Sequence, residues 1–156
     1  MNIRMLRMRE DAKLPLRAHK ADAGMDLFYC PNGERNDIIE RDGLAITPRE
    51  SKLIPTGIKV EVPYGHMLEI KNKSGVAYKR QLIVGACVID PGYDGEVYVN
   101  LHNLGLNTQY LHPGDKIAQG VLIPIVHCEI EEVFDTGILN IDSTRGSGGF
   151  GSTGDK

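Results

Sequence analysis

The chain has 156 residues and a mass of 17.2 kDa, with 41% hydrophobic and 25% charged residues, and these values predict one domain with its own core. The formal net charge is −3 and the Lys and Arg residues are scattered, so binding to nucleic acid through phosphate neutralisation is not expected. The sequence has no apolar run of membrane length and no apolar h-region near its charged start, so we expect neither membrane binding nor a targeting segment.

Alternation of apolar and polar residues with a period of two is the dominant pattern along the chain. Residues 58–62 (IKVEV) alternate, residues 82–90 (LIVGACVID) form a short apolar run rich in β-branched residues, and residues 96–103 (EVYVNLHN) alternate again. Residues 120–133 (GVLIPIVHCEIEEV) predict one long strand or two shorter ones, with Pro124 at an edge or a bulge.

Turn signals separate these segments at short intervals, as in YCPNGE, VPYGH, DPGYDG and HPGD. A helical turn or two is expected only in SGVAYKR, with Ser74 as the N-cap. The pattern predicts an all-β domain of many short strands, in a sandwich, a jelly roll or a barrel. Small all-β chains of this kind often protect their edge strands by forming oligomers.

The spacing of the Cys and His residues indicates neither a disulfide framework nor a metal site. The three cysteines, Cys30, Cys87 and Cys128, are odd in number and show no CxxC spacing, and the five His residues show no HxH or HExxH spacing. A disulfide framework and a dedicated His/Cys metal site are therefore not expected, and the pattern fits a reducing, cytoplasmic location.

Two stretches in the first half of the chain combine charged residues with glycine. In AGMDL, Asp26 lies between apolar residues, so its carboxylate is expected to point away from the core, either solvated or near a metal or a cation. In NKSGVA, Lys73, Ser74 and Gly75 place a cation, a hydroxyl and open backbone at a possible helix N-terminus. That combination suits an anion, although an ordinary N-cap explains Ser74 equally well.

Two further stretches follow in the second half. In VIDPGYDGEV an apolar strand ends at Asp90, and Pro91 and Gly92 are the favoured central pair of a type II turn before Tyr93. A carboxylate at the mouth of an apolar strand suits a general base, whereas the plainer interpretation is a residue that caps the turn of a hairpin. In PGDKIAQ, Gln119 is either a donor to a ligand or a simply exposed strand residue.

The C-terminal stretch RGSGGFGSTG is rich in Gly and by itself predicts a flexible end. It is not a P-loop, because GxxxxGK[ST] is absent. If it binds phosphate, it must close as a lid, with Arg145 as a bidentate clamp, Ser152 and Thr153 as donors, and Phe150 over a flat group.

In order and spacing, AGMDL, KSGVA, VIDPGYDGEV, PGDKIAQ and RGSGGFGSTG resemble the five motifs of the homotrimeric dUTPases (dUTP diphosphatases), over nearly the whole chain. The resemblance implies a distorted jelly-roll (β-clip) subunit over residues 1–142 with at most one short helix, and a mobile lid over residues 143–156. It also implies a homotrimer with active sites at the subunit interfaces. The implied reaction converts dUTP and water to dUMP and diphosphate, which cleans the nucleotide pool and supplies the dTMP precursor. Mg²⁺ would be bound mainly by the phosphates.

The resemblance also implies roles for individual residues. Asp90 matches the general base that activates the water attacking the α-phosphorus, and Tyr93 matches the residue that packs on the deoxyribose and excludes a 2′-hydroxyl. Asp26 matches an acid that holds metal-bound water or orients the site, without being a direct metal ligand. The other implied substrate contacts, to uracil or to the phosphates, are Lys73, Ser74, Gly75, Cys87, Val88, Ile89, Tyr98, Gln119, Arg145, Phe150, Gly151, Ser152 and Thr153.

Two residues depart from the family pattern. Lys73 stands where the family usually has Arg, which keeps the charge but loses the planar fork. Cys87 stands where the family commonly has Gly, beside the main chain that is implied to bind uracil. Two alternative functions are weighed: a dCTP deaminase of the same fold, and a dUTP-responsive module that binds another protein through residues 28–43.

Overall fold

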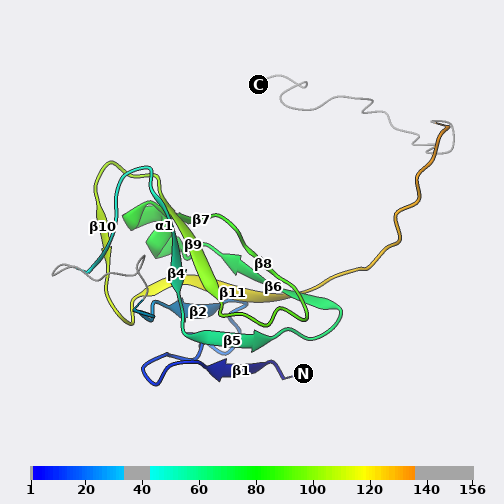
Figure 1. Ribbon diagram of the computed structural model, residues 1–156, viewed down its shortest axis with the longest axis horizontal. Helices are drawn as coiled ribbons and strands as arrows, with labels where there is room; N and C mark the ends of the chain where they lie inside the picture. Colours follow the sequence, from blue (N-terminus) through cyan, green and yellow to red (C-terminus); the bar gives the residue numbers. More distant parts are fainter. Residues whose placement is uncertain (1, 34–42, 136–156) are drawn as a thin grey trace. The chain divides into compact units, whose positions relative to one another are not determined.

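The structure is a computed structural model that describes residues 2–33 and 43–135, and in these ranges the chain forms eleven short strands and one helix (Figure 1). The elements are β1 (Arg4–Arg7), β2 (Met25–Phe28), β3 (Leu44–Ile46), β4 (Ser51–Pro55), β5 (Ile58–Glu61), β6 (His66–Lys71), α1 (Ser74–Arg80), β7 (Leu82–Val84), β8 (Val88–Ile89), β9 (Tyr98–Asn103), β10 (Gln109–Leu111) and β11 (Lys116–Pro124). The predicted all-β class with at most one short helix is confirmed.

The largest sheet has the strand order β2-β11-β6-β8, and all of its pairs are antiparallel. Strands far apart in the sequence are neighbours here, since β11 lies between β2 and β6 (Figure 1). Two of the sequence motifs, AGMDL on β2 and PGDKIAQ on β11, therefore lie side by side. The motif VIDPGYDGEV, which contains β8, starts from the opposite edge of the same sheet.

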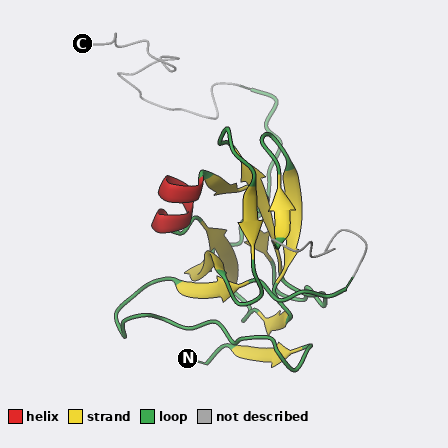
Figure 2. Cartoon of the chain, turned by 90° about the vertical axis from the view of Figure 1, so that its left-hand side faces the viewer, coloured by secondary structure: helices red, strands yellow, loops and turns green. Residues whose placement is uncertain are grey.

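Three smaller antiparallel sheets complete the described strands, with the orders β4-β9-β7, β1-β5 and β10-β3. None of these sheets closes into a barrel within the described ranges. The helix α1 (red in Figure 2) contacts β7 and β11, and its buried residue is Val76. Ten of the strands and the helix contribute buried side chains to one apolar cluster, and β1 packs against that cluster through Met5. This core fixes the loops that carry the candidate residues.

The alternating segments fold as their pattern predicts. Strand β9 has a strict alternation of half-buried and buried residues, and β5 buries Ile58 and Val60. The apolar run 82–90 instead forms two strands in different sheets, β7 and β8. Gly85 makes the break possible, because a Cβ at this position would lie 2.2 Å from Asn100 Oδ1 on β9.

The expectation of strand over all of residues 120–133 is wrong for its second half. Strand β11 ends at Pro124, and residues 125–133 form no strand. Proline has no N–H for the sheet ladder, so it suits the end of a strand. The side chains of Val126 and Ile130 in this segment are more than nine-tenths exposed.

The compact β unit comprises residues up to Val126, and a second unit begins at His127. The predicted boundary between residues 142 and 143 and the tail after it lie outside the described residues, as do residues 34–42 of the segment 28–43. At the start of that segment, Tyr29 and Cys30 are buried in the core. In the part of the chain that is described, no helix is long and apolar enough to cross a membrane.

Candidate functional site

The centre of the largest sheet brings the first group of predicted residues together. In the register of β11, Gln119 lies opposite Asp26 on β2 and opposite Lys71 on β6. The amide Nε2 of Gln119 donates a hydrogen bond to the main-chain oxygen of Asn72, at 2.9 Å. Asp26, Lys73, Ser74, Gly75 and Gln119 therefore surround the junction of β6 and α1, and we call them the junction cluster.

Asp26 does not point away from the core, and that expectation is wrong. The residue is 4% exposed, and all four residues of β2 are buried, so the period-two rule does not apply to this strand. Asp26 Oδ1 accepts a hydrogen bond from Lys73 Nζ at 2.7 Å. Asp26 Oδ2 is buried without a directed hydrogen bond, and the ammonium group of Lys116, 2.7 Å away, balances its charge. A buried carboxylate requires such pairing.

The two lysines decide the ionisation of this carboxyl. Burial raises the pKa of Asp26, but the contacts with Lys116 and Lys73 lower it by more, so the net pKa lies below the ordinary value. Lys116, beside the junction cluster, adds a second ammonium group to that of Lys73, so one net positive charge remains around the Asp26 carboxylate. Such a surplus favours an anionic ligand.

Ser74 is not the N-cap of α1, contrary to expectation. The helix begins at Ser74, and Lys73 is the N-cap with an extended backbone and no side-chain capping bond. The Lys73 side chain is instead directed to Asp26, while its main-chain oxygen accepts the N–H groups of Val76 and Ala77, each at 2.9 Å. Ser74 and Gly75 are exposed beside it, where a ligand can reach both.

The second group of predicted residues lies around a pocket of about 250 Å³, which we call the hairpin pocket. It is lined by Ile70, Ala86, Cys87, Val88, Ile89, Asp90, Tyr93, Glu96, Val97 and Tyr98. Cys87 is half-buried and also packs against the core. The Tyr98 hydroxyl accepts a hydrogen bond from Asn32 Nδ2 at 3.0 Å. All the predicted hairpin residues thus converge on one pocket.

The predicted type II turn is confirmed by the backbone. Gly92 has a φ of +86°, which only glycine adopts readily, and the Tyr93 N–H donates to Asp90 O at 3.3 Å. The Asp90 side chain is exposed at the rim of the pocket, so the described residues do not shield it from water.

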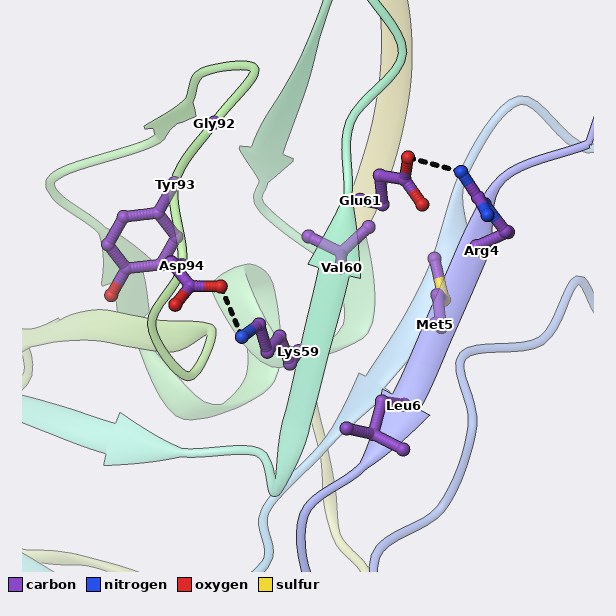
Figure 3. A pocket seen from close by; sticks show the side chains of 9 residues that line it. All are labelled: Arg4, Met5, Leu6, Lys59, Val60, Glu61, Gly92, Tyr93 and Asp94. Atoms are coloured by element: carbon purple, nitrogen blue, oxygen red, sulfur yellow. Dashed lines mark hydrogen bonds and ion pairs between the residues drawn. The ribbon is translucent and has the colours of Figure 1, made fainter.

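A larger hollow of about 390 Å³ lies on the other side of the same hairpin (Figure 3). It lies between β1, β5 and the hairpin, and Tyr93 is the predicted residue that lines it. The charged groups drawn there form two ion pairs, Arg4 with Glu61 and Lys59 with Asp94. Because its charges are paired and it holds neither Asp90 nor the β8 main chain, we place the candidate site in the smaller hairpin pocket.

Asp90, at one end of the hairpin pocket, and Gln119, in the junction cluster, lie apart within one chain. Ile89 pairs with Leu68 while Gln119 pairs with Lys71, and the antiparallel direction of β8 carries Asp90 toward the opposite end of β6. At about 3.3 Å per residue, Asp90 and Gln119 are separated by roughly 13 Å along the strands, plus two strand spacings of about 4.8 Å across them. Asp90 and Gln119 therefore do not face each other within a single chain.

The remaining predicted residues, Arg145, Phe150, Gly151, Ser152 and Thr153, lie outside the described residues. No three His, Cys, Asp or Glu side chains gather as a metal site within residues 2–33 and 43–135. Sequence reasoning missed Lys116 as the second partner of Asp26. It lies in PGDKIAQ, but a bulge between Lys116 and Ala118 sets its register, and no local pattern signals that contact.

A family model described as dUTPase matches residues 10–154 of the chain. The chain is 40% identical to a deoxyuridine 5′-triphosphate nucleotidohydrolase of Gloeothece citriformis, over 99% of this chain and 97% of that protein. It is 42% identical to the protein of the same name from Clostridium tetani, over 94% and 92%.

Among solved structures, the dUTPase of Staphylococcus bacteriophage 80alpha with dUpNHpp matches with a TM-score of 0.81 and 26% identity, over 98% of both chains. A mutant dUTPase of phage phi11 of S. aureus, described for its coordination of a structural Mg(II) ion, matches with a TM-score of 0.74 and 25% identity. The match covers 86% of this chain and 98% of that one.

Proposed function

Because the chain belongs to the dUTPase family, we propose that it hydrolyses dUTP to dUMP and diphosphate, with Asp90 as the base that activates the attacking water. The observation that carries this proposal is the hairpin pocket, in which Asp90, Tyr93 and the β8 main chain converge. Its cellular role would be to remove dUTP from the cytoplasmic nucleotide pool and to supply dUMP.

Recognition of uracil is assigned to the main chain of β8 and its surroundings. β8 is an edge strand, paired with β6 alone among the described strands, so one side of its main chain can hydrogen-bond to a base edge. Val88 and Ile89 belong to this strand and Cys87 precedes it, while Tyr98 also lines the pocket. Tyr93 would pack on the deoxyribose and reject a 2′-hydroxyl.

The phosphates would bind at the junction cluster of a neighbouring subunit. Gln119, Ser74 and Gly75 offer an amide, a hydroxyl and open backbone, beside a surplus positive charge from Lys73 and Lys116. This cluster and Asp90 lie apart within a single chain. A homotrimer that brings the junction cluster of one subunit to the hairpin pocket of another would therefore complete each site. The tail residues Arg145, Phe150, Gly151, Ser152 and Thr153 of a third subunit would close it.

The proposed cofactor is Mg²⁺, held mainly by the phosphates of the substrate. Mg²⁺ prefers carboxylate, phosphate and water oxygens, and it would neutralise charge on the phosphates. Both Asp26 oxygens face ammonium groups, which fits a residue that orients Lys73 better than one that holds metal-bound water. Asp90 at the rim of the hairpin pocket is exposed and would hold the water for attack.

A substrate panel tests this function. Diphosphate release is measured for dUTP, dCTP, dTTP and UTP, with and without Mg²⁺, and ammonia release from dCTP is measured alongside. We expect a strong preference for dUTP and no ammonia. Ammonia from dCTP would favour the deaminase alternative, and equal rates with all four nucleotides would overturn the proposal.

Replacement of Gly24 by Ala should weaken the binding of the phosphates. A Cβ at this position would lie 1.9 Å from Gln119 Oε1 and 3.2 Å from Gln119 Cβ, so the amide must leave its bond to Asn72. We expect KM for dUTP to rise about tenfold, the typical loss of one hydrogen bond to a charged group, with kcat changed less. Gly33→Ala serves as the control: its φ of +74° strains an alanine and should lower stability, but a Cβ there meets nothing within 4 Å, so KM should stay unchanged.

The three cysteines should differ in their reaction with iodoacetamide. Burial raises the pKa of the Cys30 thiol and the residue is 3% exposed, so Cys30 should not react in the folded protein. Cys128 is exposed and should react freely, while the half-buried Cys87 should react more slowly. We expect dUpNHpp to protect Cys87 but not Cys128, as measured by peptide mass spectrometry. Equal labelling of Cys87 with and without the analogue would remove it from the site.

A further inference from the structure

Glu96 is a buried carboxylate on the wall of the hairpin pocket for which the proposed reaction has no use. It is 8% exposed. Arg9 Nη1 donates to Glu96 Oε2 at 2.9 Å, and Arg9 Nη2 donates to Oε1 at 2.5 Å. The Gly57 N–H donates to the same Oε1 at 2.6 Å. A bidentate pair with a third donor holds the carboxylate in one position.

Both partners of this pair are anchored to the core side of the hairpin. Arg9 Nη2 also donates to the main-chain oxygen of Cys30 at 2.9 Å. The residue after Glu96 is fixed as well, because the Val97 N–H donates to Ile58 O at 2.8 Å and Thr56 Oγ1 donates to Val97 O at 2.6 Å. The returning arm of the hairpin is therefore rigid at Glu96, while its turn is exposed.

The Tyr93 ring rests on this rigid arm. Its hydroxyl donates to the main-chain oxygen of Glu96 at 2.9 Å. The ring lies so close to Gly95 that a Cβ there would lie 2.4 Å from the hydroxyl oxygen and 2.5 Å from Cζ. The position of the ring is thus set by the main chain of Gly95 and Glu96. The main chain of Glu96 is held on its C-terminal side by the Val97 N–H bond to Ile58, and through its side chain by the ion pair with Arg9.

We propose that the Arg9–Glu96 ion pair positions Tyr93 and thereby determines how strongly the enzyme rejects nucleotides with a 2′-hydroxyl. This inference rests on the proposed function, in which Tyr93 packs on the deoxyribose. When the pair is lost, Glu96 and the residues before it gain freedom, the ring moves, and the space that it denied to the 2′-hydroxyl opens. Arg9 and Glu96 are positioning residues, since neither is assigned a contact with the substrate.

The test compares kcat/KM for dUTP with kcat/KM for UTP. Removing Arg9 alone would leave a buried, unpaired carboxylate and could unfold the chain, so the main variant is the double substitution Arg9→Met with Glu96→Gln, which leaves no unpaired charge. We expect the ratio of kcat/KM for dUTP to kcat/KM for UTP to fall about tenfold in this variant. Most of that change should come from a higher kcat/KM with UTP, and the loss of kcat/KM with dUTP should be smaller. Gly95→Ala, which displaces the ring directly, should lower the ratio in the same way.

Controls separate positioning from stability. Arg4→Ala breaks the exposed pair of Arg4 with Glu61 on the neighbouring strands and should leave the ratio unchanged. Arg9→Lys keeps the charge but not the planar fork, so it should retain part of the selectivity that the double variant loses. If the double variant melts at a lower temperature but keeps the wild-type ratio, the inference is overturned alone. If the wild type itself does not prefer dUTP, the proposed function is overturned and the inference with it.

Discussion

Replacing Asp90 by Asn is expected to lower kcat for dUTP about a thousandfold and to leave the fold intact. An amide of the same shape cannot accept the proton of the attacking water, and general base catalysis typically contributes about 10²- to 10⁴-fold. Asp90 is exposed at the rim of the hairpin pocket, so the free energy of unfolding should change by less than about 0.5 kcal/mol. Diphosphate release and a thermal melt measure the two quantities.

Asp94 supplies the matched control, because it is an exposed carboxylate four residues further along the same hairpin. Its side chain pairs with Lys59 at the larger hollow (Figure 3), and Asp90 does not line that hollow. Asp94→Asn should retain the wild-type rate within about twofold, which is the range of an ordinary surface substitution. An Asp90→Asn enzyme with full activity, or equal losses in both variants, would contradict the role of Asp90 as the base.

Replacing Asp26 by Asn should lower the free energy of unfolding at neutral pH. The amide leaves the ammonium groups of Lys73 and Lys116 without their shared counter-charge. Removal of one partner from a fully buried ion pair costs about 3–5 kcal/mol. Here the lysines are 31% and 45% exposed and can turn toward water, so we expect a loss of about 2 kcal/mol in urea unfolding at pH 7.

The pH dependence of that loss follows from the lowered pKa of Asp26 in the folded state. The stabilisation by Asp26 is fully present above the unfolded pKa of about 3.9, because the carboxyl is then ionised in both states. As the pH falls below that value, the unfolded chain takes up the proton first, and the advantage is lost as the pH falls through the folded pKa. The stability curves of wild type and Asp26→Asn should therefore converge below about pH 4. A difference that stays constant from pH 7 to pH 3 would show that the ion pairs are not its origin.

A substitution of Lys73 would separate the effect of charge from the effect on stability. Lys73 is one of two ammonium groups on Asp26, so its loss leaves Lys116 to balance the carboxylate. Asp26→Asn, by contrast, perturbs both the fold and the placement of Lys73. The family departure at this position has a structural counterpart: an ammonium group suffices for a single contact with Asp26 Oδ1, where a guanidinium would offer two donors.

Local patterns in the sequence predicted several elements because their causes are local. The alternation in residues 96–103 is reproduced in β9, and Pro91-Gly92 forms the type II turn before Tyr93, since only neighbouring residues determine a pleat or a turn. The order and spacing of five short motifs also sufficed to indicate the family, which the family model and the relatives confirm.

What the tertiary structure decided depends on contacts between residues far apart in the chain. Asp26 is buried because Lys73 and Lys116, from a loop and a strand distant in sequence, pair with its two oxygens. The Arg9–Glu96 pair joins positions 87 residues apart, and no periodicity signals it. The separation of Asp90 from Gln119 follows from the strand order β2-β11-β6-β8 and from the registers of β6 with β8 and β11. A sequence pattern records which face of a strand is apolar, but the partner of a buried charge is fixed only when the strands pack, because burial makes pairing necessary.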